Sequence, residues 1–297
     1  MPEFIQFILA GVVVGFCVGV TGVGGGSLMT PMLIGLFRIE PHVAIGTDLL
    51  YAAISKFCGS FVHAKKLNIV WSIVGWLALG SIPASLATSW VLKHYLSGAT
   101  HYKAVLTIVL GFMLMLTGFS IVFRRYIEAF FQKYCKHSLD SATLVDRAQI
   151  SQWVGDKKQL VIFMGVVLGV FVTLSSVGAG AFGVMALLLM FPNLPMIRII
   201  GSDVVHAVLL TLVAGLGHLS AGNVDFYLLG WLLAGSIPAI IIGTLLSSKM
   251  PEQLIRRILG LTLLLLGINF MVHPVKAKPA SVQPSAVQAS GQAQAIR

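Results

Sequence analysis

Long apolar stretches alternate with short polar connections along this chain. Eight of the stretches are long enough, or nearly so, to cross about 30 Å of hydrocarbon at about 1.5 Å per helical residue. They are residues 4–20, 43–62, 69–92, 104–123, 160–177, 199–217, 226–246 and 258–272. The pattern predicts an all-α polytopic membrane protein that resides in a lipid bilayer.

The apolar pattern contains an internal duplication, because three segments return in the same order about 155 positions later. GVVVGFCVGVTGVGGGS at 11–27 returns as GVVLGVFVTLSSVGAGA at 165–181, IGTDLL at 45–50 as IGSDVV at 200–205, and GWLALGSIPA at 75–84 as GWLLAGSIPA at 230–239. A duplication of apolar segments with a glycine-rich break in each copy is typical of transporters built from two related halves. Their binding site lies between the halves.

Composition excludes several other classes of protein. Hydrophobic residues make up 57% of the chain and charged residues 10%, against about 25% charged in soluble domains. The net charge of +10 is distributed over short loops, so it indicates membrane topology and not a nucleic-acid partner. The three cysteines are scattered, and no nucleophile has a base at workable spacing. We therefore expect neither an enzyme, nor a metal site, nor a cofactor.

Loop charges predict the topology. The polar segment 124–158 contains seven Lys and Arg residues and is therefore expected in the cytoplasm. The remaining basic loops follow the positive-inside rule better if each half crosses the membrane an odd number of times, which makes the halves inverted. This divides the chain into a first membrane repeat (1–123), a cytoplasmic linker (124–158), a second membrane repeat (159–272) and a disordered tail (273–297).

A broken helical hairpin explains the odd number of crossings. The stretches 4–37 and 159–191 are too long for one helix, and each is interrupted by glycines. We predict two inverted repeats, each a broken helical hairpin plus three transmembrane helices, with both termini outside. Because non-helical backbone at membrane depth must be buried in protein or line a polar cavity, the two breaks should face each other.

The breaks are the first candidate for substrate binding. Glycine lets the backbone approach a ligand, the following half-helix presents N–H groups to an anion, and hydroxyls add donors. The candidates are Thr21, Gly24, Gly25, Gly26 and Ser27 in one half and Ser175, Ser176, Gly178 and Gly180 in the other. The glycines at 11, 15 and 19, spaced by four, are interpreted as a helix-packing stripe instead.

Ionisable residues inside the apolar stretches are the second candidate, because burying each costs about 2.5–3.5 kcal/mol. Asp48 and Asp203 are equivalent in the two repeats, and Lys56 has no counterpart, since Thr211 stands at its equivalent position. His206 lies one turn beyond Asp203. Lys56 is predicted to bind the anion, and Asp48, Asp203 and His206 to couple transport to an ion. The alternative is that Lys56 neutralises an aspartate and that the aspartates cap the hairpins.

The segments GVGGGSLMTPML (22–33) and AIGTDLL (44–50), with weaker copies in the second half, resemble the TauE/SafE family of sulfite exporters and related anion transporters. The resemblance covers about residues 5–272. It implies a bacterial inner-membrane secondary transporter for small anions, such as sulfite, thiosulfate, sulfate, organosulfonates or small organic anions. Many members carry Ser or Asn at the positions of Asp48 and Asp203, which leaves the ion coupling of this chain open.

The resulting hypothesis is alternating access, with an anionic substrate held at the breaks and by Lys56. Protons would be the coupling ion, because burial penalises a charged carboxylate and makes its occupancy depend on pH. The alternative is a passive anion channel of the same fold. The identity of the anion, the direction of transport and the oligomeric state stay open at this stage.

Overall fold

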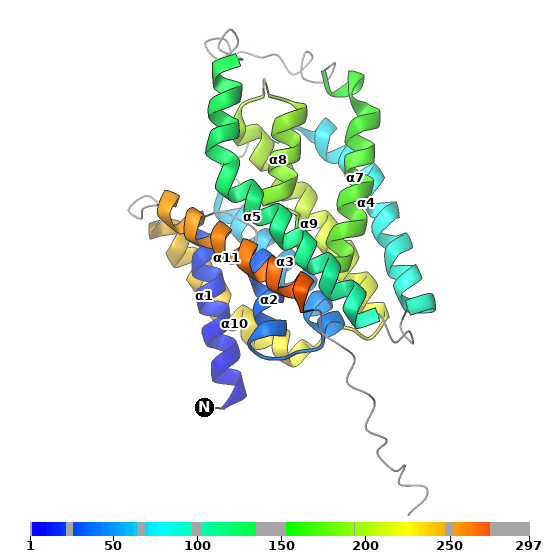
Figure 1. Cartoon of the computed structure of the whole chain (residues 1–297), viewed down its shortest axis with the longest axis vertical. Coiled ribbons are helices and arrows are strands. Elements are labelled where there is room, and N and C mark those ends of the chain that lie inside the picture. The colour runs from blue at the N-terminus through cyan, green and yellow to red at the C-terminus, as the bar shows by residue number, and fades with distance from the viewer. Residues whose placement is uncertain are drawn as a thin grey trace, which may run out of the picture.

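A computed structural model describes residues 2–21, 26–63, 69–96, 102–134, 153–192, 194–246 and 252–273. Every long element in these ranges is a helix, as the apolar pattern predicted (Figure 1). The first half contains α1 (Glu3–Thr21), α2 (Gly26–Gly35), α3 (Pro41–His63), α4 (Trp71–Val91), which continues into a π-helical turn (Leu92–Leu96), and α5 (Tyr102–Tyr134). The second half contains α7 (Lys158–Ser175), α8 (Ala181–Met190), α9 (Met196–Ser220), α10 (Phe226–Leu246) and α11 (Glu252–Val272).

Seven helical segments within the described ranges are long and apolar enough to cross a membrane. They are Glu3–Thr21, Trp71–Tyr95, Tyr102–Phe123, Lys158–Ser175, Met196–Ser220, Phe226–Leu246 and Gln253–Val272. They match seven of the eight predicted stretches. The eighth stretch, 43–62, lies in α3, which has 23 residues. The prediction of an all-α multi-pass membrane protein is confirmed.

The outer surface of the bundle is apolar. Val13, Leu79, Phe163 and Leu245 are all more than half exposed, on α1, α4, α7 and α10 respectively. Two aspartates, by contrast, are buried inside. An apolar exterior around a polar interior is the arrangement expected of a protein whose surroundings are lipid.

The two halves interlock through helix pairs. α1 packs along α10 and α7 packs along α4, so that each long helix preceding a break lies on a helix of the other half. α3 packs on α9, and α5 crosses α11. In Figure 1 the α7–α4 pair lies on the right, α1 lies on the left, and α5 and α11 cross in front of the centre. If the first and second halves are interchanged, the α1–α10 pair takes the place of the α7–α4 pair.

The predicted glycine stripe is confirmed as a packing surface. A Cβ atom at Gly11, Gly15 or Gly19 would overlap the α10 backbone. In the second half, a Cβ atom at Gly165 or Gly169 would overlap the α4 backbone in the same way. Small residues allow this close approach of helices in a membrane protein.

Equivalent helices of the two halves run in opposite directions where they touch. Along α3, Gly46 lies against Asn223 and His218, whereas Leu50, one turn later on α3, lies against Gly215, which comes earlier on α9. The order of contacts is also reversed between α5 and α11, where Gly111 meets Gly267 and Gly118 meets Gly260.

Each half contains a long helix followed by a short one. α2 and α8 have ten residues each, about 15 Å at the helical rise, which is half of the hydrocarbon thickness. The break between α7 and α8 has the positive φ angles that glycine favours, 112° at Gly178 and 138° at Gly180. The predicted first break falls mainly on residues 22–25, which lie outside the described residues. So do residues 135–152 of the predicted linker and 274–297 of the predicted tail.

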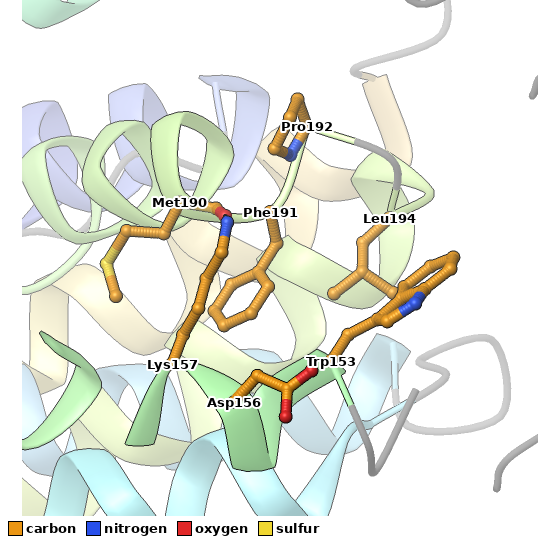
Figure 2. A pocket seen from close by; sticks show the side chains of 7 residues that line it. All are labelled: Trp153, Asp156, Lys157, Met190, Phe191, Pro192 and Leu194. Atoms are coloured by element: carbon orange, nitrogen blue, oxygen red, sulfur yellow. The ribbon is translucent and has the colours of Figure 1, made fainter. Parts of the chain in front are cut away.

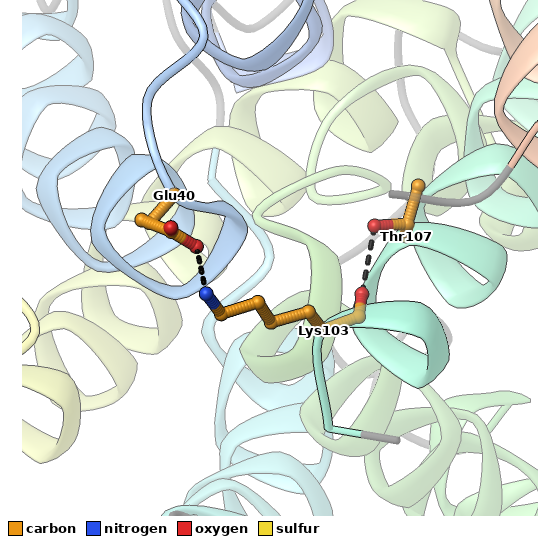
Figure 3. A network of polar contacts seen from close by, with 3 residues as sticks. All are labelled: Glu40, Lys103 and Thr107. Carbon is orange, nitrogen blue, oxygen red and sulfur yellow. Dashed lines mark hydrogen bonds and ion pairs between the residues drawn. The ribbon is translucent and has the colours of Figure 1, made fainter. Parts of the chain in front are cut away.

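An ion pair connects the start of α5 with the residues before α3. Lys103 Nζ lies 2.7 Å from a carboxylate oxygen of Glu40, and both side chains are partly exposed (Figure 3). This pair belongs to the periphery of the bundle and not to its polar interior.

Candidate substrate and ion site

The described hydroxyls at the ends of the long helices are bonded to their own helices. Thr21 Oγ1 donates to the Cys17 carbonyl at 2.6 Å, and Ser175 Oγ donates to the Phe171 carbonyl at 2.6 Å. In addition, the Val177 N–H donates to Ser175 Oγ at 3.2 Å. Thr21 and Ser175 therefore shape the ends of α1 and α7.

The other tip residues lie beside these two. Gly26 and Ser27 are the first residues of α2, and Ser27 is buried. Ser176 is also buried and has a left-handed backbone with φ of 59°. Gly24 and Gly25 lie outside the described residues.

Arg256 on α11, one of the basic residues counted for the topology, reaches the end of α1. Its Nη2 donates to the Thr21 carbonyl at 2.6 Å. A cation at this position is favourable because it meets the negative end of the helix dipole. The positive-inside count gave no sign of this contact.

Lys56 is brought to the second break. Its ammonium donates to the Ala179 carbonyl at 2.5 Å, between Gly178 and Gly180. Its charge acts on Asp48 and on Asp203, although the described residues include no ion pair within 4.0 Å between Lys56 and either carboxylate. Lys56 thus acts electrostatically on both aspartates.

Asp48 is fully buried on α3, where it accepts a hydrogen bond from the hydroxyl of Thr30 on α2. The hydroxyl of Ser176, at the break of the other half, is a further polar neighbour. Asp48 therefore joins the short helix of its own half to the break of the second half.

Asp203 has a different environment, although it occupies the equivalent position on α9. Neither of its carboxylate oxygens has a hydrogen-bond partner in the part of the chain that the structure describes. A Cβ atom at Gly183 would overlap Asp203 Oδ1, so the carboxylate lies against the first turn of α8. Val184 replaces Thr30 in the repeat, which removes the hydroxyl available to Asp48. Among the described residues, neither oxygen of Asp203 accepts a hydrogen bond of the kind that a capping role requires.

His206 bonds to a serine of the other half. Its Nε2 lies 2.8 Å from Ser81 Oγ, and both side chains are buried. In the repeat, Tyr51 is equivalent to His206, and Ser236 is equivalent to Ser81. The hydroxyl of Ser236 is indeed a polar neighbour of Tyr51.

The structure thus contains two related clusters. The first cluster is Thr30, Asp48, Tyr51, Ser55, Ser176 and Ser236, and the second cluster is Asp203, His206 and Ser81. Sequence reasoning did not select Ser81 or Ser236, although both copies of GSIPA contain a serine. The serine in both copies of GSIPA was the sequence signal from which these two positions could have been selected.

A pocket at the far end of α8 is separate from both clusters. It is lined by Trp153, Asp156, Lys157, Met190, Phe191, Pro192 and Leu194 (Figure 2). Lys157 Nζ donates to the Met190 carbonyl at 2.6 Å and lies 5.5 Å from the centre of the Phe191 ring. Lys157 therefore stabilises the C-terminal end of α8 through the helix dipole and a cation–π contact.

Comparison with known proteins identifies the family of the chain. The family model described as Sulfite exporter TauE/SafE matches residues 7–270. The chain belongs to the TauE/SafE family. No solved structure matches this chain.

Among curated relatives of this TauE/SafE protein, the probable membrane transporter protein YjnA of Bacillus subtilis (strain 168) is 35% identical over 224 residues. That match covers 75% of this chain and 82% of the relative. The probable membrane transporter protein YdhB of the same organism is 26% identical, over 75% of this chain and 81% of the relative. The probable membrane transporter protein MJ0441 of Methanocaldococcus jannaschii is 30% identical over 33% of this chain and 40% of the relative. This TauE/SafE protein is a multi-pass membrane transporter.

Proposed function

We propose that this transporter is a secondary carrier that moves small anions across the bacterial inner membrane by alternating access. Sulfur-containing oxyanions or organosulfonates are the proposed substrates, and the family description names sulfite. The observation that carries the proposal is Lys56, an ammonium group within the bundle that is bonded to the backbone carbonyl of Ala179 at the second break.

The Lys56 ammonium can bind a substrate at a small cost in free energy. Its bond to the Ala179 carbonyl can be exchanged for a stronger charge-assisted bond to an anion. α8 begins two residues later, and its N-cap residue Gly180 has no side-chain cap. The N–H groups of that first turn and the positive end of the α8 dipole therefore favour an anion beside Lys56.

Asp203 supplies the coupling in this proposal. Its carboxylate lies against the first turn of α8 and within the field of Lys56. An ionised Asp203 thus competes with the anion for the same helix end and the same cation. Protonation removes this competition, so a proton and an anion should bind together. His206 lies one turn away on the same helix and within the field of Lys56, where it can relay the proton. Asp48 is the second candidate for protonation.

Burial favours a carrier over a passive channel. Asp48, Asp203 and His206 are each at most 1% exposed. A channel needs a continuous aqueous path past its charged groups, whereas a carrier encloses them between its two open states. Antiparallel contact between the equivalent helices α3 and α9, and between α5 and α11, supports inverted halves. We place segment 124–158 in the cytoplasm, as its charges indicate.

The test is uptake into proteoliposomes over a panel of sulfite, thiosulfate, sulfate, sulfonates and small carboxylates. Lys56→Met should lower kcat/KM for the transported anion by roughly a hundredfold, because losing one partner of a buried charge pair costs about 2–5 kcal/mol. Lys103→Met, at the periphery, is the control and should transport normally. Uptake by Lys56→Met equal to that of the wild type would remove Lys56 from the site.

The coupling is tested separately with Asp203→Asn and Asp48→Asn. Wild-type uptake should respond to an imposed pH gradient, and the Asn variant of the coupling residue should lose that response. An unchanged pH response in both variants would contradict the proton role. Large ohmic anion currents, in place of saturable flux, would favour the channel.

A further inference from the structure

The first cluster contains several buried oxygen atoms without hydrogen-bond partners in the described chain. They are Asp48 Oδ1, the Tyr51 hydroxyl, Ser55 Oγ, Ser176 Oγ and Ser236 Oγ. The side chains that carry them are at most 3% exposed. Leaving a buried polar group unsatisfied costs about 1–3 kcal/mol. Five such atoms in one place therefore indicate a ligand that they hold in common.

These atoms are neighbours and are not scattered through the core. Ser236 and Ser55 are the polar neighbours of the Tyr51 hydroxyl, and Asp48 is its charged neighbour. Ser176 adjoins Asp48 from the second break. The Tyr51 hydroxyl thus interacts with Ser236 and Ser55, and Asp48 with Ser176, although none of these pairs has the geometry of a full hydrogen bond. These residues come from α3, from α10 and from the end of α7.

The chemistry of the group selects a hard cation of low charge. All of its members are oxygen atoms, four from neutral hydroxyls and one from a carboxylate, and oxygen ligands suit alkali and alkaline-earth ions. One carboxylate balances one positive charge. A buried carboxylate without a cation at bonding distance is costly, and a monovalent ion beside it would compensate the carboxylate charge.

The second cluster provides an internal comparison. Ser55 is replaced there by Leu210, Tyr51 by His206 and Thr30 by Val184. The remaining serine, Ser81, is already bonded to His206. The second cluster therefore lacks the set of oxygen ligands, although its aspartate is retained. Of the two clusters in the described chain, the first has this set of oxygen ligands and the second does not.

We propose that Asp48, Tyr51, Ser55, Ser176 and Ser236 form a sodium-binding site. The site lies next to the substrate site, because Ser55 precedes Lys56 in the chain and Ser176 precedes the Ala179 carbonyl by three residues. A bound ion joins α3 to α10 and to the second break, so its occupancy stabilises one arrangement of the two halves. Its role as a coupling ion rests on the proposed anion transport, whereas the binding of sodium does not.

The experiment measures the thermal stability of the purified full-length protein against NaCl concentration, with choline chloride keeping the ionic strength constant. The wild type should show a saturable rise in Tm with sodium, and a smaller one with potassium. Ser55→Ala and Ser236→Ala should each raise the apparent sodium Kd roughly tenfold, the order expected when a charged group loses one polar partner. Asp48→Asn should lose the response.

Ser81→Ala is the matched control, because it removes the equivalent serine from the second cluster. Its sodium Kd should equal that of the wild type, even if its Tm in choline differs. Each variant is compared with itself in choline, so a general loss of stability does not imitate the result. Equal Tm values in sodium and choline for the wild type would overturn the proposal. An equal loss of affinity in Ser81→Ala and Ser236→Ala would also overturn it.

Anion transport is measured independently, in sodium-free proteoliposomes with a pH gradient. Uptake there without a sodium effect on Tm refutes the sodium site and leaves the proposed anion transport standing. A sodium effect on Tm without uptake of any anion, with or without a sodium gradient, supports the site and refutes the transport proposal.

Discussion

The hydrogen bond from Thr30 to Asp48 gives a direct measure of how strongly the short helix α2 is held in the bundle. Thr30→Val removes this bond and changes little else, because valine has the same branched shape and leaves no cavity. Both residues are fully buried, so water cannot replace the lost donor. Asp48 would then keep only its weaker polar neighbours.

The magnitude follows from the charge of the acceptor. A hydrogen bond to a charged group contributes about 1.5–3 kcal/mol. At about 2 °C per kcal/mol for a large domain, Thr30→Val should lower Tm by roughly 3–6 °C. Thr107→Val is the control, since Thr107 is equally buried but donates to the Lys103 carbonyl of its own helix at 2.7 Å (Figure 3). That carbonyl lies within a helix, so the control should lose less than about 1 °C.

The assay is thermal unfolding of both variants in one detergent at one pH, followed by uptake in proteoliposomes. Thr30→Val should lose stability and transport together, because α2 and α3 move apart at the site. Equal Tm losses in Thr30→Val and Thr107→Val would refute the reasoning, since the bond to Asp48 would then contribute no more than a bond within a helix.

Two further predictions concern residues on either side of this interior. Gly183→Ala should abolish uptake, because the added methyl group would overlap the Asp203 carboxylate and displace α8. Gly230→Ala is the control, because a Cβ atom there meets no atom within 4 Å. Normal uptake by Gly183→Ala would show that the contact with Asp203 tolerates adjustment. Glu40→Gln breaks a partly exposed ion pair with Lys103, so it should lower stability by less than about 1 kcal/mol, with an effect that decreases in high salt. A larger and salt-independent loss would assign this pair a structural role.

Much of the fold follows from local patterns. The length of each apolar stretch predicts a helix that crosses the hydrocarbon, and the structure has helices at all eight stretches. Gly178 and Gly180 lie in the break between α7 and α8, and Gly11, Gly15 and Gly19 pack against α10, where the pattern predicted a break and a packing stripe. These properties depend on neighbours in sequence and on the thickness of the membrane, so a single chain is sufficient to predict them.

The environments of the ionisable residues could not be predicted in the same way. Asp48 and Asp203 are equivalent in the repeat, yet one accepts a hydrogen bond from Thr30 and the other has no partner among the described residues. The difference arises on another helix, where threonine in α2 corresponds to valine in α8. A pattern along α3 and α9 contains no information about that neighbour.

The sequence by itself therefore determined the class of protein, the duplication, the helices and the residues that are costly to bury. Only the tertiary structure decided their partners: Lys56 with the Ala179 carbonyl, His206 with Ser81, and Arg256 with the end of α1. The physical reason is the separation of the interacting residues along the sequence. Hydrophobic periodicity acts between residues a few positions apart, whereas each of these contacts joins residues separated by more than 120 positions. Such contacts exist only after the two halves have packed together.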